Sequence, residues 1–267
     1  MLRPDRHGSR CFDPPNLEDT ADLDEFALDA MVVHAASSME GTHSNVIGLM
    51  APTEKCASDP DDPCVLSVLF DAIGCTRKWG LACSVDGAGY LVLGHCSQDC
   101  IGSLPMGYTP FSTGYTYMGA YIADIEAFLA GPSPQELTPL AEGLAPKFLI
   151  IDSGTADNYI TSSLSRGFLE AGFPHTHDVF RQDDLDGLPC FEIVLRNGVR
   201  LGFTPPRYMQ DEMQNGSYYS TLRMDDPNID ALFGAQSPVM MLGIAGMMGL
   251  YFEFDLEQRR IGVAKYI

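Results

Sequence analysis

Asp152 is the residue whose position in the sequence most suggests chemistry. It follows an apolar run, Phe-Leu-Ile-Ile at 148–151, and precedes Ser153-Gly154-Thr155. A carboxylate at the end of a buried strand is expected to lie where the dielectric constant is low, which raises the cost of ionising it. Gly154 permits a sharp turn that brings peptide N–H groups near the acid, and the hydroxyls of Ser153 and Thr155 can orient it. The loop suits an aspartic acid that shares a proton with a partner group.

The same tripeptide also occurs as an ordinary turn after a strand, in which the aspartate binds its own backbone and has no catalytic role. Asp-Ser-Gly alone does not separate these two interpretations. The order of the elements around it has to decide between them.

Short apolar runs separated by turn residues predict a fold rich in β-strands. The 267 residues include 26 glycines and 18 prolines, and 45% are hydrophobic, which is enough for a large buried core. Hairpins are expected where two apolar runs flank a glycine-containing turn. The expected elements are a hairpin at 79–94 turned at 86–89, a hairpin at 191–203 turned at Asn197-Gly198, a buried strand at 147–155, a helix at 162–173, and a helix or strand at 65–74.

The net charge of −20, from 16 basic and 36 acidic residues, excludes some partners. Binding to nucleic acid or to anionic lipid needs clustered positive charge, so neither is expected. The charge fits either a solvated acidic surface or a protein suited to low pH. No apolar stretch is long enough for a membrane span, and residues 1–25 have no signal-peptide segment. This N-terminus indicates either a cytosolic protein or a missing true N-terminus.

The eight cysteines could form disulfides or bind a metal ion. Cys96 and Cys100, beside His95, could bind a metal, but a structural zinc site usually needs a second short pair and the sequence has none. We therefore expect disulfides, no metal and no cofactor, with Cys190 lacking an obvious partner. The motifs of serine hydrolases, zinc proteases and phosphate-binding loops are absent from the sequence.

From Val46 to the end of the chain, the order of segments resembles the pepsin-like aspartic proteases (peptidase family A1). The segments that carry the resemblance are, in order, NVIGLMAP, GYLVLG, GYTPF, TYMGAYIADI, FLIIDSGT, LPCFEIVLRNGVRLGFTPPRYM, MMLG and FEFDLEQRRIGVAKYI. The resemblance implies a mainly β, bilobal acid-protease fold with an incomplete N-terminal lobe and a complete C-terminal lobe. The domains expected from it are a disordered leader at 1–20, a partial N-terminal lobe at 21–111, and a C-terminal acid-protease lobe at 112–267.

The resemblance also implies an aspartic-type endopeptidase that hydrolyses peptide bonds with a water molecule activated by aspartate. Asp152 would be the catalytic aspartate of the C-terminal lobe, in an active-site loop with Ser153, Gly154 and Thr155. The expected partner is a polypeptide substrate, and a monomer is expected. The resemblance further implies a secretory, vacuolar or lysosomal location, although no signal peptide is present.

The sequence lacks residues that the catalytic mechanism of this family requires. Such enzymes hold one water between two aspartates, one charged and one protonated. A second Asp-Thr/Ser-Gly is absent, and the segment most similar to it, Glu18-Asp19-Thr20-Ala21, lacks the glycine. Gly243 is followed by Ile-Ala-Gly-Met at 244–247 in place of the usual acid and aromatic residues, and Ala156 replaces a hydroxyl residue.

Three hypotheses follow from these departures. The chain is an endopeptidase by descent, whose missing aspartate lies in a longer product; or a catalytically inactive protein that retains part of the cleft as a peptide-binding or protein-binding surface; or a homodimer that pairs two copies of Asp152.

Overall fold

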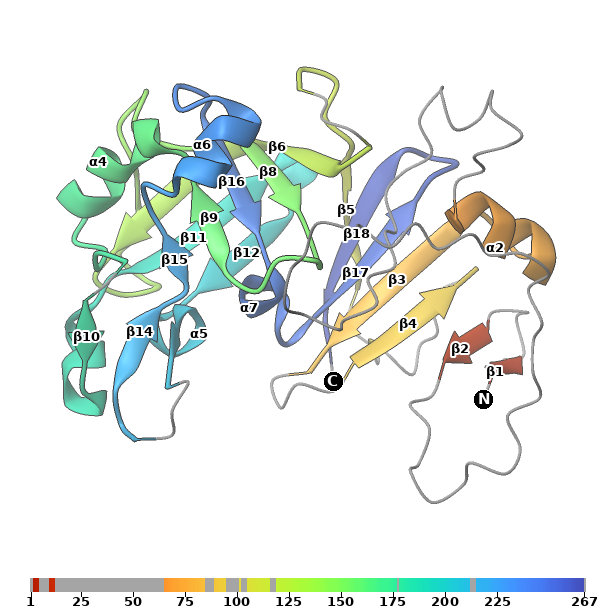
Figure 1. The fold of residues 1–267 in the computed structure, drawn as a ribbon, viewed down its shortest axis with the longest axis horizontal. Helices are drawn as coiled ribbons and strands as arrows, with labels where there is room; N and C mark the ends of the chain where they lie inside the picture. The colour runs from red at the N-terminus through yellow and green to blue at the C-terminus, as the bar shows by residue number, and fades with distance from the viewer. Residues whose placement is uncertain are drawn as a thin grey trace.

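The structure is a computed structural model that describes residues 2–4, 10–12, 65–84, 89–94, 101, 105–115, 119–176, 178–211 and 215–266. Two large β-sheets form most of the described fold. One sheet occupies the right-hand side of Figure 1, and the other, covered by helices, lies on the left. The first sheet has the order β1 (Leu2–Pro4), β2 (Arg10–Phe12), β4 (Gly89–Leu93), β3 (Lys78–Cys83), β17 (Leu250–Asp255), β18 (Arg260–Lys265) and β5 (Gly107–Pro110).

The second sheet contains both the strand that precedes Asp152 and the strand that lies beside it. Its order is β12 (Arg200–Phe203), β11 (Cys190–Leu195), β6 (Tyr121–Gly131), β8 (Phe148–Ile151), β16 (Val239–Leu242), β9 (Asn158–Ile160) and β15 (Leu222–Arg223), with β7 (Thr138–Pro139) paired to β6. A small third sheet has the order β10 (Val179–Phe180), β14 (Tyr218–Ser220) and β13 (Met209–Gln210).

Short helices connect these strands. The α-helices are α2 (Val65–Ile73), α4 (Ser162–Glu170), α5 (Pro205–Tyr208), α6 (Pro227–Phe233) and α7 (Ile244–Met247), and the 3₁₀ turns are η1 (Gln182–Gly187) and η2 (Arg196–Gly198). The segment at 65–74, left open between helix and strand, forms α2. Leu66, Phe70 and Ile73 recur at helical spacing, and all three contact the core.

The pairing of β8 with β16 positions the candidate site. The two strands run parallel, with Ile151 opposite Leu242. Leu149 and Ile150 are almost completely buried, and so are all four residues of β16. Continuous apolar runs without alternation are typical of strands that are covered on both faces. Because parallel strands end at the same edge of a sheet, the loops that follow β8 and β16 meet.

An aromatic cluster fills the core of the second sheet. Phe191 stacks on Phe203 with ring centroids 4.4 Å apart, and on Phe128 at 5.3 Å. Phe128 in turn contacts Phe168 of α4 at 4.9 Å. Offset stacking of this kind adds to the free energy gained from burying aromatic surface. The cluster fixes α4 and the β11–β12 hairpin against β6.

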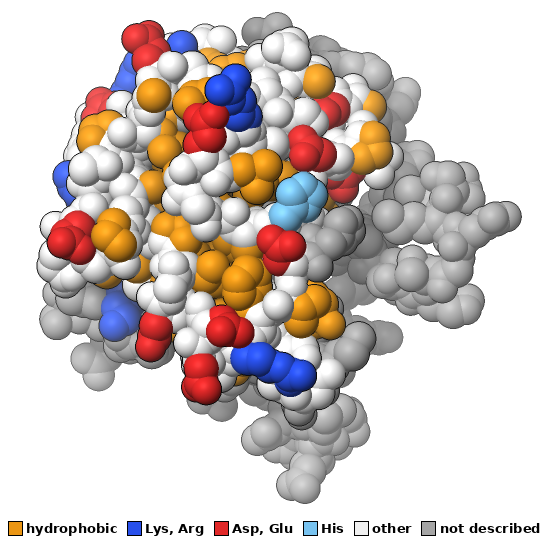
Figure 2. All heavy atoms as spheres, turned by 90° about the vertical axis from the view of Figure 1, so that its left-hand side faces the viewer, with side chains coloured by type: hydrophobic (Ala, Val, Ile, Leu, Met, Phe, Trp, Pro, Cys, Tyr) orange, Lys and Arg blue, Asp and Glu red, His pale blue; other side chains and the backbone are white. Residues whose placement is uncertain are grey.

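The outer side of the second sheet exposes apolar side chains of α4, β10 and α6. Leu169, Val179 and Leu232 are 41–55% exposed. Figure 2 shows hydrophobic side chains across the middle of the face on this side, with acidic and basic side chains around them. Scattered exposed hydrophobic residues are normal on soluble proteins, so they define no site by themselves.

The expected elements mostly form. The strands of both hairpins pair as predicted, with Asn197 and Gly198 at positive φ (64° and 74°) in the second turn. The turn at 86–89 and the segment NVIGLMAP lie outside the described residues, apart from Gly89 in β4. Strands β1 and β2 fall within residues 1–20, and β17 and β18 join the sheet that contains β3 to β5. Nothing tests the domain boundaries at 20/21 and 111/112, which stay predictions.

Candidate functional site

Asp152 is the first residue after β8, at the edge where β8 and β16 end. Its N–H donates to the carbonyl of Leu242 at 3.0 Å, which continues the ladder by one residue. Asp152 is half-buried, and the next two residues, Ser153 and Gly154, are exposed. The carboxylate is therefore less enclosed than expected for the end of a buried strand.

The carboxylate of Asp152 is held by its own loop. Oδ1 accepts the N–H of Gly154 at 2.9 Å, and Oδ2 accepts the hydroxyl of Thr155 at 2.7 Å. Within the described part of the chain, no second carboxylate joins these contacts. Each carboxylate oxygen has two acceptor sites, so each retains one that a ligand can use.

Gly154 serves the loop by allowing close approach. Its φ is not positive, so the left-handed freedom of glycine is not required here. A Cβ at this position would lie 3.1 Å from Asp152 Oδ1, closer than an ordinary contact. The absence of a side chain lets the peptide N–H reach the carboxylate. Of the two hydroxyls expected to orient the acid, Thr155 does so, whereas Ser153 faces solvent.

The loop after β16 supports the loop of Asp152. The N–H of Ile244 donates to the carbonyl of Thr155 at 2.8 Å, and the N–H of Ala245 donates to the carbonyl of Ala156 at 2.9 Å. A Cβ on Gly243 would lie 2.1 Å from the carbonyl oxygen of Asp157, so only glycine fits between the loops. The start of α7 therefore fixes the backbone that follows Asp152.

Asn158 is a positioning residue that the sequence analysis did not identify. It is completely buried; its Oδ1 accepts the N–H of Gly243 at 3.1 Å, and its Nδ2 donates to Thr221 Oγ1 at 3.1 Å. One side chain thus connects the two loops to the segment before β15. The residue types alone gave no signal, because the partners lie 85 and 63 positions away.

Arg207 supports the far end of α7 and was also missed. Its guanidinium donates to the carbonyls of Gly246 and Met248, both at 3.1 Å, and to the carbonyl of Gly202 at 2.8 Å. Burial lowers the pKa of the Arg207 side chain to about 10. Its Nε is buried without a hydrogen-bond partner. The side chain joins β12 to the last turn of α7 and to Met248, the residue that follows it.

Several predicted features fall outside the described residues. These are His95, Cys96, Cys100 and the segment 18–21, which was compared with a second Asp-Thr/Ser-Gly. Across the described residues, no group of three or more potential metal ligands comes together. Cys83 and Cys190 are buried free thiols. This agrees with the lack of a partner expected for Cys190, whereas Cys83 takes no part in the disulfides expected from the cysteine count. No helix in the described ranges is long and apolar enough to cross a bilayer.

Comparison with known proteins gives a likeness of fold. The chain is similar to the crystal structure of basic 7S globulin from soybean, with a TM-score of 0.54 and 15% identity over 76% of this chain. It spans 56% of the length of that globulin. No family model matches the sequence, and no curated protein matches it. The mainly β, bilobal pepsin-like fold expected from the sequence is confirmed.

The assignment to the pepsin-like aspartic protease family is wrong. No family model supports it, and a solved structure that the chain resembles is that of a globulin, at an identity that shows the fold alone. The order of apolar runs and turns specifies a backbone topology, whereas an activity depends on a few side chains placed on it. The segments quoted above therefore indicated the fold correctly and the family incorrectly.

Proposed function

We propose that this chain is a catalytically inactive protein of pepsin-like fold that binds polypeptide, and that the Asp152 loop is part of its binding surface. The observation that supports the proposal most directly is the isolation of the Asp152 carboxylate from any second acid among the described residues. Both oxygens of Asp152 accept hydrogen bonds from the loop itself, and no described carboxylate shares them.

Hydrolysis by an activated water needs two acids with different protonation states. One takes the proton of the water while the other protonates the carbonyl oxygen of the substrate. Asp152 supplies one such group, and the sequence contains no second Asp-Thr/Ser-Gly. A single charged carboxylate still binds peptide N–H groups well, because hydrogen bonds to ionised acceptors are short and strong.

The loop has the exposure and rigidity that binding requires. Ser153 and Gly154 are exposed, while Thr155 and Ala156 are fixed by two backbone hydrogen bonds from α7. A rigid loop loses little conformational entropy when a ligand binds to it. The unused acceptor sites of Asp152 and the hydroxyl of Ser153 can then pair with the backbone of an extended peptide.

The catalytic test is an assay for cleavage of an acid-denatured protein at pH 3–5, with the wild-type chain and Asp152→Asn. We expect no turnover by either. Turnover by the wild type that the substitution abolishes would contradict the proposal, because it would show that Asp152 activates a water.

The binding test uses a phage-displayed library of linear ten-residue peptides selected on the immobilised wild-type chain. We expect peptides that bind the wild type at least tenfold more tightly than Asp152→Asn, with Asp178→Asn, an exposed aspartate, as the matched control. Equal binding by all three proteins would show that Asp152 is not part of the binding surface. Sedimentation of the same samples tests the expected monomer and, against it, a dimer.

A further inference from the structure

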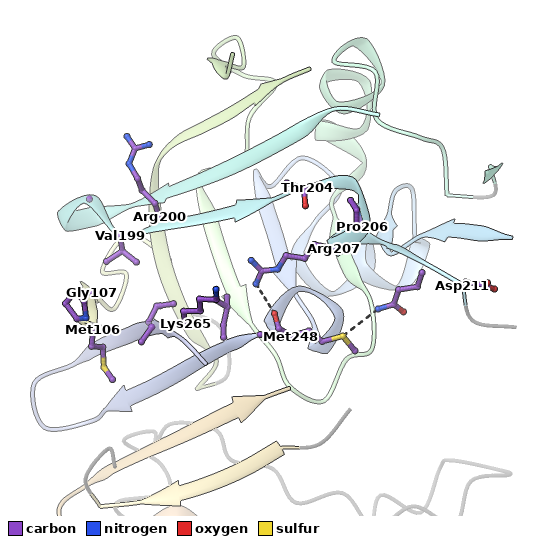
Figure 3. A pocket seen from close by; sticks show the side chains of 17 residues that line it. Met106, Gly107, Val199, Arg200, Thr204, Pro206, Arg207, Asp211, Met248 and Lys265 are labelled. Carbon is purple, nitrogen blue, oxygen red and sulfur yellow. Dashed lines mark hydrogen bonds between the residues drawn. The ribbon is translucent and has the colours of Figure 1, made fainter. Parts of the chain in front are cut away.

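A groove of about 1070 Å³ lies at a place that the Asp152 loop does not line. Its walls come from the start of β5, the start of β17, the end of β18, the turn before β12, and the segment from α5 to Asp211. Figure 3 shows Met106, Val199, Arg207, Met248 and Lys265 around it. The volume lies at the upper end of the usual range for small-molecule pockets, which is about 300–1000 Å³.

Part of the groove is apolar. Met106, Val199, Met248, Leu250 and Val263 all line it. Methionine side chains are flexible and polarisable, so they adapt to varied ligand side chains. An apolar lining that is open to solvent favours a ligand with apolar side chains of its own.

The charges in the groove oppose those of the whole molecule. Acidic residues outnumber basic ones by 36 to 16 in the chain, but among the described residues the lining contains Arg200, Arg207 and Lys265 against a single carboxylate, Asp211. Both oxygens of Asp211 accept backbone N–H groups, from Asn215 at 3.0 Å and Gly216 at 2.7 Å. The groove is therefore locally positive.

Two of the three cations have no carboxylate partner among the residues that the structure describes. Arg200 pairs with Glu192, and its side chain points away from Arg207 and Met248 in Figure 3. Arg207 donates to three carbonyls, and Lys265 is exposed; neither forms an ion pair with any residue in the described ranges. Carbonyl dipoles offset the charge of Arg207 only in part, so a nearby anion would be strongly stabilising.

Sheet edges at the groove favour an extended ligand. β12 is the last strand of the second sheet, and β5 is the last strand of the first. Residues of both strands, Gly107 and Arg200, line the groove. The edge of a sheet carries backbone groups that face away from its neighbour. An incoming extended segment can pair with such groups other than the carbonyls of Gly202 and Tyr108, which accept the side chains of Arg207 and Asn197.

We infer that this groove binds an extended, acidic segment of a polypeptide, whose carboxylates pair with Arg207 and Lys265 and whose apolar side chains contact the methionines and Leu250. The inference goes beyond the proposed function, because it assigns a second surface that does not include Asp152. The overall charge of −20 repels such a ligand at long range. Screening over about 8 Å at physiological ionic strength leaves the local cations dominant.

The experiment measures fluorescence anisotropy with a labelled ten-residue peptide that alternates Glu and Val, added to the full chain at 0.15 M salt. We expect saturable binding that weakens at least tenfold in Lys265→Glu and in 1 M salt. Arg207→Lys, which retains the charge but loses the fork of donors, is expected to weaken binding several-fold. Circular dichroism verifies that each variant is folded.

Lys147→Glu is the matched control, because Lys147 is exposed, lies outside the groove and gives the same change in net charge. The inference is overturned if Lys147→Glu weakens binding as much as Lys265→Glu, if a peptide alternating Lys and Val binds equally well, or if no binding occurs up to 1 mM. Full competition by millimolar free glutamate would also overturn it, since that outcome indicates a small-anion site. We expect Asp152→Asn to bind the labelled peptide as tightly as the wild type does. That result would show that this groove is distinct from the binding surface proposed around Asp152.

Discussion

Trp79 and Tyr121 join the two large sheets through a buried hydrogen bond. The indole Nε1 of Trp79, on β3 of the first sheet, donates to the hydroxyl of Tyr121, on β6 of the second, at 2.8 Å. The two rings also meet edge to face, with centroids 5.5 Å apart, and Phe254 stacks on Trp79 at 4.3 Å. Residues 42 positions apart therefore fix one sheet against the other.

The first prediction is that Tyr121→Phe weakens this junction. The phenyl ring keeps its packing, but the buried Nε1–H of Trp79 loses its acceptor, which costs about 1–3 kcal/mol of unfolding free energy. Trp79 is the only tryptophan, so its emission reports the site directly and should shift to shorter wavelength. Urea unfolding followed by fluorescence measures both effects. Tyr219→Phe, which removes a half-buried hydroxyl, should change stability by less than about 0.5 kcal/mol; equal losses in the two variants would contradict the prediction.

The sequence predicts much of this fold because its signals are local. Apolar runs bounded by glycine turns gave β3, β4, β11 and β12, and the Asn197-Gly198 turn has the positive φ that its residues favour. The apolar run Phe-Leu-Ile-Ile before Asp152 predicted both strand β8 and the position at which it ends.

The supports of the site could not be predicted, because they act across the chain. Arg207 meets its carbonyl partners 39 and 41 residues away, and Asn158 contacts Gly243 across 85. No single sequence shows which of 267 residues a buried amide or guanidinium will reach. The glycine at 243 resembles any other glycine until β8 and β16 are placed side by side.

Gly243 provides the second prediction, which concerns the contact between the two loops. A methyl group in Gly243→Ala would overlap the carbonyl oxygens of Asp157 and Thr155, at 2.1 and 2.6 Å. Its φ of −89° is accessible to alanine, so the penalty is steric and not conformational. We expect a loss of about 1–3 kcal/mol, the usual effect of overpacking, measured by urea unfolding.

The control for this substitution is Gly187→Ala. Nothing lies within 4 Å of the new Cβ at Gly187, and its φ is not positive. Stability should stay the same or rise by up to about 1 kcal/mol, because alanine reduces the entropy of the unfolded chain. If Gly243→Ala is as stable as this control, the loops are not in the contact described.

The third prediction concerns the hydroxyl that holds Asp152. Thr155→Val keeps the shape of the side chain but removes the donor to Oδ2, at a cost of about 1–2 kcal/mol for a half-buried, charge-assisted bond. Ser153→Ala, at an exposed neighbour, should cost less than about 0.5 kcal/mol. Unfolding free energies of the two variants at pH 7 decide the question, and a larger loss from Ser153→Ala would reverse the roles assigned to the two hydroxyls.

The fourth prediction uses Asp255, a completely buried carboxylate at the turn between β17 and β18. The Lys78 ammonium lies 2.9 Å from Oδ2 and the Arg260 Nε lies 3.1 Å from it, while Oδ1 accepts the N–H of Gln258 at 3.0 Å. Burial alone would raise the pKa of Asp255, but these hydrogen bonds and the nearby Lys78 charge hold the pKa below its ordinary value of 3.8. The folded state thus binds the proton of Asp255 less readily than the unfolded state does.

The sign of the pH dependence follows from this lowered pKa. Asp255 stabilises the fold fully above about pH 4, and its contribution is lost as the pH falls below that value through the folded pKa. Asp255→Asn should therefore lose about 3 kcal/mol of unfolding free energy at pH 7, and less at pH 2.5. At pH 7 it leaves Arg260 without its carboxylate and leaves Lys78 with only the more distant Glu253, whose Oε1 lies 3.9 Å away. Urea unfolding of both proteins from pH 7 to 2.5 measures the difference between them. Curves that stay parallel below pH 4 would show that Asp255 has no such linkage. Curves that converge would indicate that this carboxylate opposes adaptation to low pH, which favours the solvated-surface interpretation of the acidic composition.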